Sequence, residues 1–128
     1  MPMLHKPLLI YVAGPYSNDD RVIRDKNIGQ ARDAMAILLR AGHIPYCPHT
    51  HTARMEDTHP DIDYNTYLLH GLHILGMCDM LFLVGDYENS DGTTTERECA
   101  EEWEIPECDN YDQIPPVVGY PTATELTD

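Results

Sequence analysis

The sequence predicts an α/β fold in which helices cover both faces of a mostly parallel sheet of four to five strands. Short, continuous apolar runs have the length of buried strands. Between them lie segments whose apolar residues recur at helical spacing. The two kinds of segment alternate along a chain of 128 residues, a length that suits a single domain spanning residues 1–128.

The first strand and helix have the clearest signals. Residues 8–13 form an apolar run that ends at Gly14–Pro15. Residues 17–20 then supply helix-capping side chains, and Gly42 suits the position just after a helix. The helix between them is indicated by apolar residues at helical spacing, namely Ile28, Ala31, Met35 and Leu38.

The next elements follow the same alternation. Residues 43–47 predict a weaker strand, and Pro45 and Pro48 place it at the edge of the sheet. Residues 50–61 are polar and predict a loop. A helix ending near Gly76 is indicated by Tyr64, Leu68, Leu72 and Leu75.

The last elements are a buried strand at residues 80–84, a loop at 85–92 and a helix. This helix is indicated by Thr95, Cys99 and Trp103, which are spaced four residues apart. The segment 109–128 is an acidic tail rich in proline, in which residues 114–118 form a weak strand candidate. Its last residues, 122–128, are expected to be frayed or to depend on a partner.

The composition excludes several classes of function. A formal net charge of -14 argues against binding to duplex nucleic acid or to an anionic membrane surface. No apolar run approaches the ~20 residues of a membrane helix, and residues 1–7 do not resemble a signal peptide. We therefore expect a cytoplasmic protein.

The cysteines and histidines do not predict a metal site. Four cysteines without a C-x-x-C pair are typical of a reduced intracellular protein. Cys47, His49 and His51 alternate, with His59 nearby, but this spacing matches no common zinc motif. We expect neither a metal nor an organic cofactor.

Ligands of parallel sheets bind beyond the carboxyl ends of the strands. Loops 14–20 and 85–92 are expected at that edge. The second leads through Ser90 and Gly92 to Glu96, which is expected in the first turn of the last helix, where the helix dipole favours a negative charge. The alternative is a capping box in which Glu96 only binds the Thr93 backbone.

Other polar side chains are candidates for the same site. Tyr11 is placed to project from the first strand and hydrogen-bond a carboxylate, and Tyr16 to cover a base or a sugar. Arg21 or Arg24 is placed to hold a phosphate. Proton transfer is a possible role for Asp63, His70 and His73, which otherwise form a solvated helix face.

Taken together, these segments resemble the nucleoside 2-deoxyribosyltransferase superfamily, which includes 2'-deoxynucleoside 5'-monophosphate N-glycosidases and small phage-type relatives. The resemblance runs from Leu9 to about Pro106. It rests on the order and spacing of residues 10–16 (IYVAGPY), 41–45 (AGHIP), 47–49 (CPH) and 75–79 (LGMCD), followed by Ser90-x-Gly92, Glu96, Ala100 and Ile105–Pro106.

The resemblance implies a flavodoxin-like three-layer sandwich and an assembly of two or more copies. It implies that Glu96 is the nucleophile that forms a glycosyl ester and that Tyr11 orients it. Ser90 and Gly92 look like the loop that holds the 5' end of the sugar. The remaining substrate-binding residues are expected to be Gly14, Tyr16, Arg21 and Asp79.

Two segments depart from the family pattern. The family has an aspartate that assists proton transfer to the leaving base, and this chain has Gly71 there. His70, Asp63 or another group is then expected to substitute. Residues 104–107 are too polar for the usual next strand.

The implied activity is cleavage or exchange of the N-glycosidic bond of a 2'-deoxynucleoside, with a free nucleobase as product or acceptor. Ser90 favours a 5'-monophosphate substrate instead, whereas Asp91 opposes it. Gly71 leaves open a catalytically impaired nucleotide-binding module, and an interaction domain without a small ligand is a third possibility.

Overall fold

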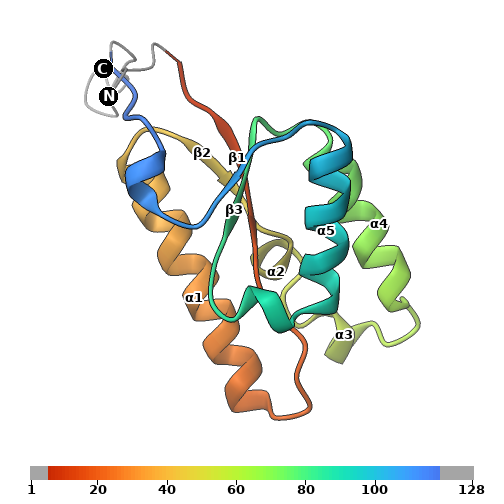
Figure 1. The fold of residues 1–128 in the computed structure, drawn as a ribbon. Coiled ribbons are helices and arrows are strands. Elements are labelled where there is room, and N and C mark those ends of the chain that lie inside the picture. Colours follow the sequence, from red (N-terminus) through yellow and green to blue (C-terminus); the bar gives the residue numbers. More distant parts are fainter. Residues whose placement is uncertain (1–5, 119–128) are drawn as a thin grey trace, which may run out of the picture.

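The computed structural model describes residues 6–118, and within them four strands form one fully parallel sheet (Figure 1). The strand order is β2-β1-β3-β4. The strands are β1 (Leu9–Ala13), β2 (Ile44–Tyr46), β3 (Met80–Leu83) and β4 (Glu107–Cys108). The predicted α/β class, parallel sheet and edge position of the second strand are confirmed.

Helices lie on both faces of the sheet, which gives three layers (Figure 1). The helix α1 (Arg21–Arg40) covers one face, and α4 (Tyr64–Leu75) and α5 (Asp91–Glu102) cover the other. Two short helices, α2 (Pro48–His51) and α3 (Met55–Thr58), and the 3₁₀ turn η1 (Tyr87–Asn89) lie between the main elements. A second 3₁₀ turn, η2 (Tyr111–Gln113), follows β4.

Residues of β1 alternate between the two cores, because successive side chains of a strand point to opposite faces. Ile10 and Val12 pack with α1, in a cluster that also contains Leu38 and Phe82. Tyr11 and Ala13 point to the opposite face, toward residues of α4 and α5. All four of these β1 side chains are 0% exposed, which explains the continuous apolar run.

The ends of α1 follow the capping signals of the sequence. Asp20 is the N-cap, and its Oδ1 accepts a hydrogen bond of 2.9 Å from the Val22 backbone N–H. Ala41 is the C-cap, and Gly42 follows with φ +90°. That left-handed conformation suits glycine and turns the chain toward β2.

The carboxyl ends of β1 and β3 lie close together. A Cβ atom on Gly14 would meet the Val84 carbonyl oxygen at 2.6 Å, so only glycine fits there. The chain leaves β1 toward β2 but reaches β3 on the other side of β1. This reversal of direction is where open parallel sheets bind ligands.

Three predictions for connecting segments were wrong. Residues 50–61 are not all loop, because α2 starts with Pro48 at its first turn, a favoured helix position, and α3 follows. Glu107 takes part in β4 despite its charge, because its side chain lies outside the sheet and pairs with Arg97 at 3.0 Å. Residues 114–118 hold only an isolated bridge at Val117.

The prediction for residues 122–128 of the tail lies outside the described residues. Among the helices of residues 6–118, none has both the length and the apolar character needed to cross a membrane.

Candidate active site

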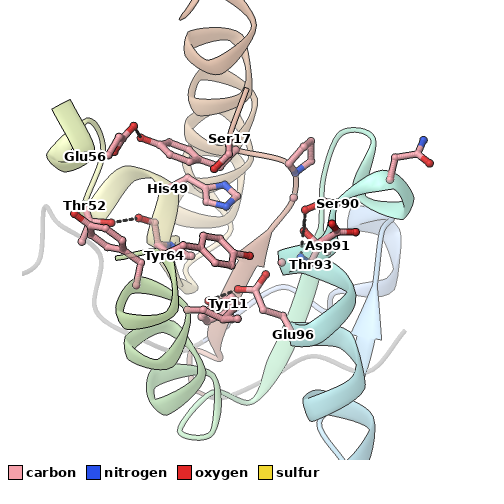
Figure 2. Close-up of a pocket in the computed structure, with 18 of the residues that line it drawn as sticks. Tyr11, Ser17, His49, Thr52, Glu56, Tyr64, Ser90, Asp91, Thr93 and Glu96 are labelled. Carbon is pink, nitrogen blue, oxygen red and sulfur yellow. Dashed lines mark hydrogen bonds between the residues drawn. The ribbon is translucent and has the colours of Figure 1, made fainter. Parts of the chain in front are cut away.

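A pocket of about 570 Å³ opens at the carboxyl ends of β1 and β3, on the face covered by α4 and α5 (Figure 2). The two predicted loops contribute to its wall, through residues 14–17 and 89–92. Tyrosine and histidine side chains give it an aromatic character, and three carboxylates line it. These side chains are Tyr11, Tyr16, His49, Tyr64, Tyr67, Glu56, Asp91 and Glu96.

Glu96 is placed in this pocket by the rotation of α5. The N-cap of the helix is Ser90, whose Oγ accepts a hydrogen bond of 3.2 Å from the Thr93 N–H. Glu96 therefore lies in the second turn, and the first-turn position expected from the sequence was wrong. The capping-box alternative is also wrong, because the cap is Ser90 and not Thr93.

The ionisation of Glu96 is set by burial. Its side chain belongs to a residue that is only 4% exposed, and burial raises its pKa from 4.5 to about 7. The hydrogen bond from Tyr11 opposes this rise. The sequence predicted that the helix dipole favours the ionised form of Glu96. The structure differs, because the influence of the dipole falls off beyond the first turn and Glu96 lies in the second.

Tyr11 donates a hydrogen bond from its hydroxyl to Glu96 Oε2, as predicted (Figure 2). The tyrosine is 0% exposed, and burial, together with the neighbouring carboxylate, raises the pKa of its hydroxyl far above the usual value. Tyr11 therefore stays protonated and fixes one carboxylate oxygen. The second oxygen forms no hydrogen bond within the described residues and is left for a ligand.

Gly71 provides the space that Tyr11 occupies. A Cβ atom at position 71 would lie 2.5 Å from the Tyr11 hydroxyl oxygen. Any larger residue at this position would displace the tyrosine from Glu96. Gly71 replaces the aspartate that the resemblance leads one to expect at this position. The Tyr11 hydroxyl occupies the space in which a side chain of residue 71 would begin.

Tyr16 and His49 form an aromatic wall opposite the α5 side. Their rings stack, with centroids 5.1 Å apart. The Tyr16 hydroxyl donates to Glu56 at 2.7 Å and accepts from the Arg54 N–H at 3.0 Å, so the ring is held in place. Burial lowers the pKa of His49 to about 4, which makes its imidazole neutral at pH 7.

Gly14, Ser90 and Gly92 line the pocket as predicted. The Ser90 hydroxyl, however, has a structural role. Besides capping Thr93 N–H, its oxygen accepts a hydrogen bond of 2.9 Å from the Thr93 hydroxyl. We therefore assign Ser90 first to the start of α5.

Six predicted site residues lie outside the pocket lining, and one of them is His73, an exposed residue of α4. Asp63 is the exposed N-cap of α4, where it accepts from the Thr66 N–H at 2.9 Å. His70 is exposed and stacks on His51, with ring centroids 5.7 Å apart. Arg21 is an exposed first residue of α1, because the helix starts beyond the mouth of the pocket.

Asp79 lies at the amino end of β3, the end of the sheet opposite the pocket. Its Oδ2 accepts a hydrogen bond of 2.8 Å from the Leu9 N–H and so ties β3 to β1. Arg24 is also engaged elsewhere, in ion pairs with Glu56 at 3.1 Å and with Asp57 at 3.3 Å.

Sequence reasoning gave no binding role to several pocket residues, among them His49, Glu56 and Tyr64. His49 stood within a motif of the resemblance, but its alternation with Cys47 drew attention to metal binding. Within the described residues, no three His, Cys, Asp or Glu side chains form a metal-binding group. Glu56 had no signal and Tyr64 indicated only a helix face, because only the path of the chain brings these two residues to the pocket.

The comparisons with known proteins match this architecture. A family described as a domain of unknown function, DUF7768, matches residues 8–108, which run from the strand β1 to β4. No curated protein matches the chain. A solved 2-deoxyribosyltransferase from the bacterium Bacillus psychrosaccharolyticus superposes with a TM-score of 0.54 at 18% identity, over 91% of this chain and 79% of that chain. The likeness confirms the flavodoxin-like fold.

Proposed function

The chain belongs to the DUF7768 family, and we propose that it is an enzyme that cleaves or exchanges the N-glycosidic bond of 2'-deoxynucleosides, with Glu96 as nucleophile. One observation carries the proposal. A buried carboxylate at the bottom of an aromatic pocket has one oxygen fixed by Tyr11, and its other oxygen has no hydrogen-bond partner among residues 6–118. The similarity in fold to a 2-deoxyribosyltransferase supports the choice of substrate.

The proposed reaction has two steps. A Glu96 oxygen bonds to C1' of the sugar as the C1'–N bond breaks, and the bonding electron pair leaves with the base, which takes up a proton. Water then attacks C1', releasing the carboxylate and a proton and giving the free sugar; a second nucleobase in place of water gives exchange. Covalent catalysis of this kind divides one difficult step into two easier ones.

A 2'-deoxy sugar suits this chemistry because it lacks the electron-withdrawing 2'-hydroxyl, so C1' tolerates positive charge. Tyr11 holds the carboxylate in one orientation before the attack. The nucleophile must be ionised. With a pKa of about 7, about half of the Glu96 side chains are ionised at neutral pH.

The base is proposed to lie against the wall formed by Tyr16 and His49, whose stacked rings offer an apolar surface. A neutral His49 presents one donor and one acceptor nitrogen. Neither His70 nor Asp63 lines the pocket, so neither is retained as the source of the proton for the leaving base. Assembly into a homodimer or larger homo-oligomer and a cytoplasmic location stay predictions.

The test uses Glu96→Ala and a matched control on the same helix, Glu98→Ala, whose side chain is exposed. Both variants are incubated with 2'-deoxynucleosides, with and without an acceptor base, and base release is measured. We expect E96A to lose about 10³-fold or more of the activity, the size typical of removing a nucleophile. E98A should retain it.

Intact-mass spectrometry of the quenched wild type should show a deoxyribosyl adduct that E96A lacks. Undiminished base release by E96A would remove Glu96 from the mechanism and with it the proposal.

A nucleotide-binding module without catalysis is the second candidate, and Gly71 favours it because the pocket has no carboxylate at that position. Thermal unfolding separates the two. A deoxynucleoside that raises Tm without any release of base would support the module, since binding to the native state alone stabilises a protein.

A further inference from the structure

A second pocket, of about 400 Å³, lies between α1 and the segment that runs from α2 to the start of α3. It shares no lining residue with the first pocket. One wall is a single face of α1, because its residues are spaced i, i+3, i+4 and i+7 along the helix. These residues are Asp25, Ile28, Gly29 and Arg32. The other wall is formed by Thr50, Ala53 and Arg54.

The second pocket differs in charge from the first. Two arginines, Arg32 and Arg54, line it, whereas the first pocket is lined by three carboxylates and by no lysine or arginine of the described part of the chain. The whole sequence has only 8 lysines and arginines against 22 acidic residues. Two arginines on one concave surface therefore make this pocket a local region of positive charge in an acidic protein, which favours an anionic ligand.

Both guanidinium groups have donors free for such a ligand. Arg54 forms one ion pair, in which its Nη2 donates to Asp25 at 2.5 Å, and 41% of its side chain is exposed. A guanidinium has five N–H donors, so most of those of Arg54 have no partner among residues 6–118. Arg32 is exposed and forms no ion pair within the same residues.

The backbone of Arg54 helps to fix the position of its side chain. Its φ of +65° lies in the left-handed region, which is uncommon for a residue other than glycine. In this conformation the Arg54 N–H donates to the Tyr16 hydroxyl at 3.0 Å, while the side chain reaches Asp25 on α1. The arginine is thus held at both ends before any ligand binds.

Gly29 leaves the α1 wall of this pocket without a side chain. It lies in the interior of a 20-residue helix, where alanine is favoured over glycine. A Cβ atom on Gly29 would meet no atom of the described residues within 4 Å outside its own stretch of helix. Packing therefore does not require a glycine here, and the missing side chain keeps space open beside Arg32.

We propose that the second pocket binds the phosphate group of a small molecule between the guanidinium groups of Arg32 and Arg54. Two guanidiniums suit a phosphate better than a carboxylate, because a phosphate offers more acceptor oxygens and a larger negative charge. The pocket is larger than one phosphate group, so a phosphate ester should bind more tightly than inorganic phosphate. The site does not depend on the proposed function, because no residue lines both pockets.

Calorimetric titration tests the site with three probes: glycerol 3-phosphate, inorganic phosphate and acetate. The wild type should bind glycerol 3-phosphate most tightly and acetate at least about tenfold more weakly. Arg32→Gln should weaken the binding of glycerol 3-phosphate at least about tenfold, because it removes a charged donor without breaking an ion pair of the described residues. Equal binding of both phosphate probes would assign the site to free phosphate rather than to an ester.

Arg40→Gln is the matched control, because it removes the same charge from an exposed residue of α1 that does not line the pocket. It should change Kd by less than about twofold, since a distant exposed charge is screened. A second pair of variants tests the space. Gly29→Leu should abolish binding by filling the pocket with apolar atoms, whereas Gly29→Ala should preserve binding and raise Tm, because alanine favours the helix.

Amide ¹H–¹⁵N spectra locate the bound probe. Glycerol 3-phosphate should shift the signals of Gly29 and Ala53 in the second pocket and leave that of Gly92, in the first pocket, unchanged. A wild type that binds neither phosphate probe, an equal loss of binding in R32Q and R40Q, or shifts confined to the first pocket would overturn the proposed site.

Discussion

The two faces of the sheet bury different kinds of side chain. On the α1 face, Ile10, Val12, Leu38 and Phe82 belong to a cluster of buried hydrophobic side chains. On the opposite face, Tyr11 occupies the same layer as Leu81 and Leu75, and Glu96 is buried beside it at 4% exposure. Both faces belong to the same strands, because alternate residues of β1 and β3 serve one face and then the other.

The difference between the two faces is energetic: the side chains on the α1 face stabilise the fold, whereas the buried carboxylate on the other face opposes folding when it is ionised. Burying an apolar side chain stabilises the protein, whereas burying a carboxylate costs free energy unless it is neutral or well paired. Glu96 has one hydrogen bond and a raised pKa, so it is held in a position that is unfavourable for its charged form. Such strain at a single buried group is typical of a functional site.

Leu38→Ala tests the hydrophobic core on the α1 face. The side chain is 1% exposed, and its truncation should lower the free energy of unfolding by roughly 2–5 kcal/mol through lost burial and a cavity. The loss should be the same at pH 6 and pH 8, since no charge is involved. Urea unfolding at both pH values measures it, and a loss of activity per folded molecule would contradict the separation of the two faces.

Glu96→Gln tests the face covered by α4 and α5, and at pH 8 it should raise the free energy of unfolding, whereas Leu38→Ala lowers it. The pKa of Glu96 is about 7 in the folded protein and 4.5 in the unfolded chain. Protonation of Glu96 therefore contributes its full stabilisation below pH 4.5, and this stabilisation is lost as the pH rises through 7. The shift corresponds to about 3 kcal/mol. The neutral glutamine should therefore make the variant more stable than the wild type at pH 8 by up to that amount, while abolishing activity.

The same unfolding series at pH 4 supplies the control, because wild-type Glu96 is then neutral and the two proteins should differ little. A wild type whose stability relative to E96Q does not change between pH 4 and pH 8 would show that burial does not perturb this carboxylate. In the active wild type, the rate of glycosyl-enzyme formation should rise with pH through about 7.

The fold could be predicted because its signals are local. The apolar run of β1 and the capping residue Asp20 each report on a few neighbouring residues. The helix α5 was predicted from Thr95, Cys99 and Trp103, yet its buried residues are Thr93, Glu96 and Ala100. Hydrophobic spacing could not reveal that face, because two of its three buried residues are polar.

The site could be predicted only in part. Tyr11 and Glu96 are 85 residues apart, and their pairing followed from the family resemblance rather than from any pattern within the chain. Asp63 and His70 failed because a helical face gives no information about which side turns toward a pocket. The side of α4 that meets Tyr11 carries Gly71, which has no side chain to signal its position.

Gly71→Ala tests whether the Tyr11 position depends on the absence of a side chain on α4 at residue 71. The added methyl group would lie 2.5 Å from the Tyr11 oxygen, so the tyrosine must move away from Glu96. We expect kcat/KM to fall about 100-fold, or about 3 kcal/mol of transition-state stabilisation. Adding Tyr11→Phe removes the clashing hydroxyl, so the double variant should recover the stability lost by G71A but not its activity.

Ser90→Ala should have the smallest effect and separates a structural role from binding at the edge of the site. Loss of the N-cap of α5 should cost about 1 kcal/mol, measured by urea unfolding. Because the Ser90 oxygen accepts hydrogen bonds from both the backbone and the side chain of Thr93, we expect its main role to be the cap of α5. The kcat/KM per folded molecule should stay within about threefold of the wild type, because the loss of a helix cap acts mainly on the folding equilibrium. A hundredfold fall in kcat/KM with an unchanged free energy of unfolding would instead show that Ser90 binds the substrate and that its cap contributes little to the stability of α5.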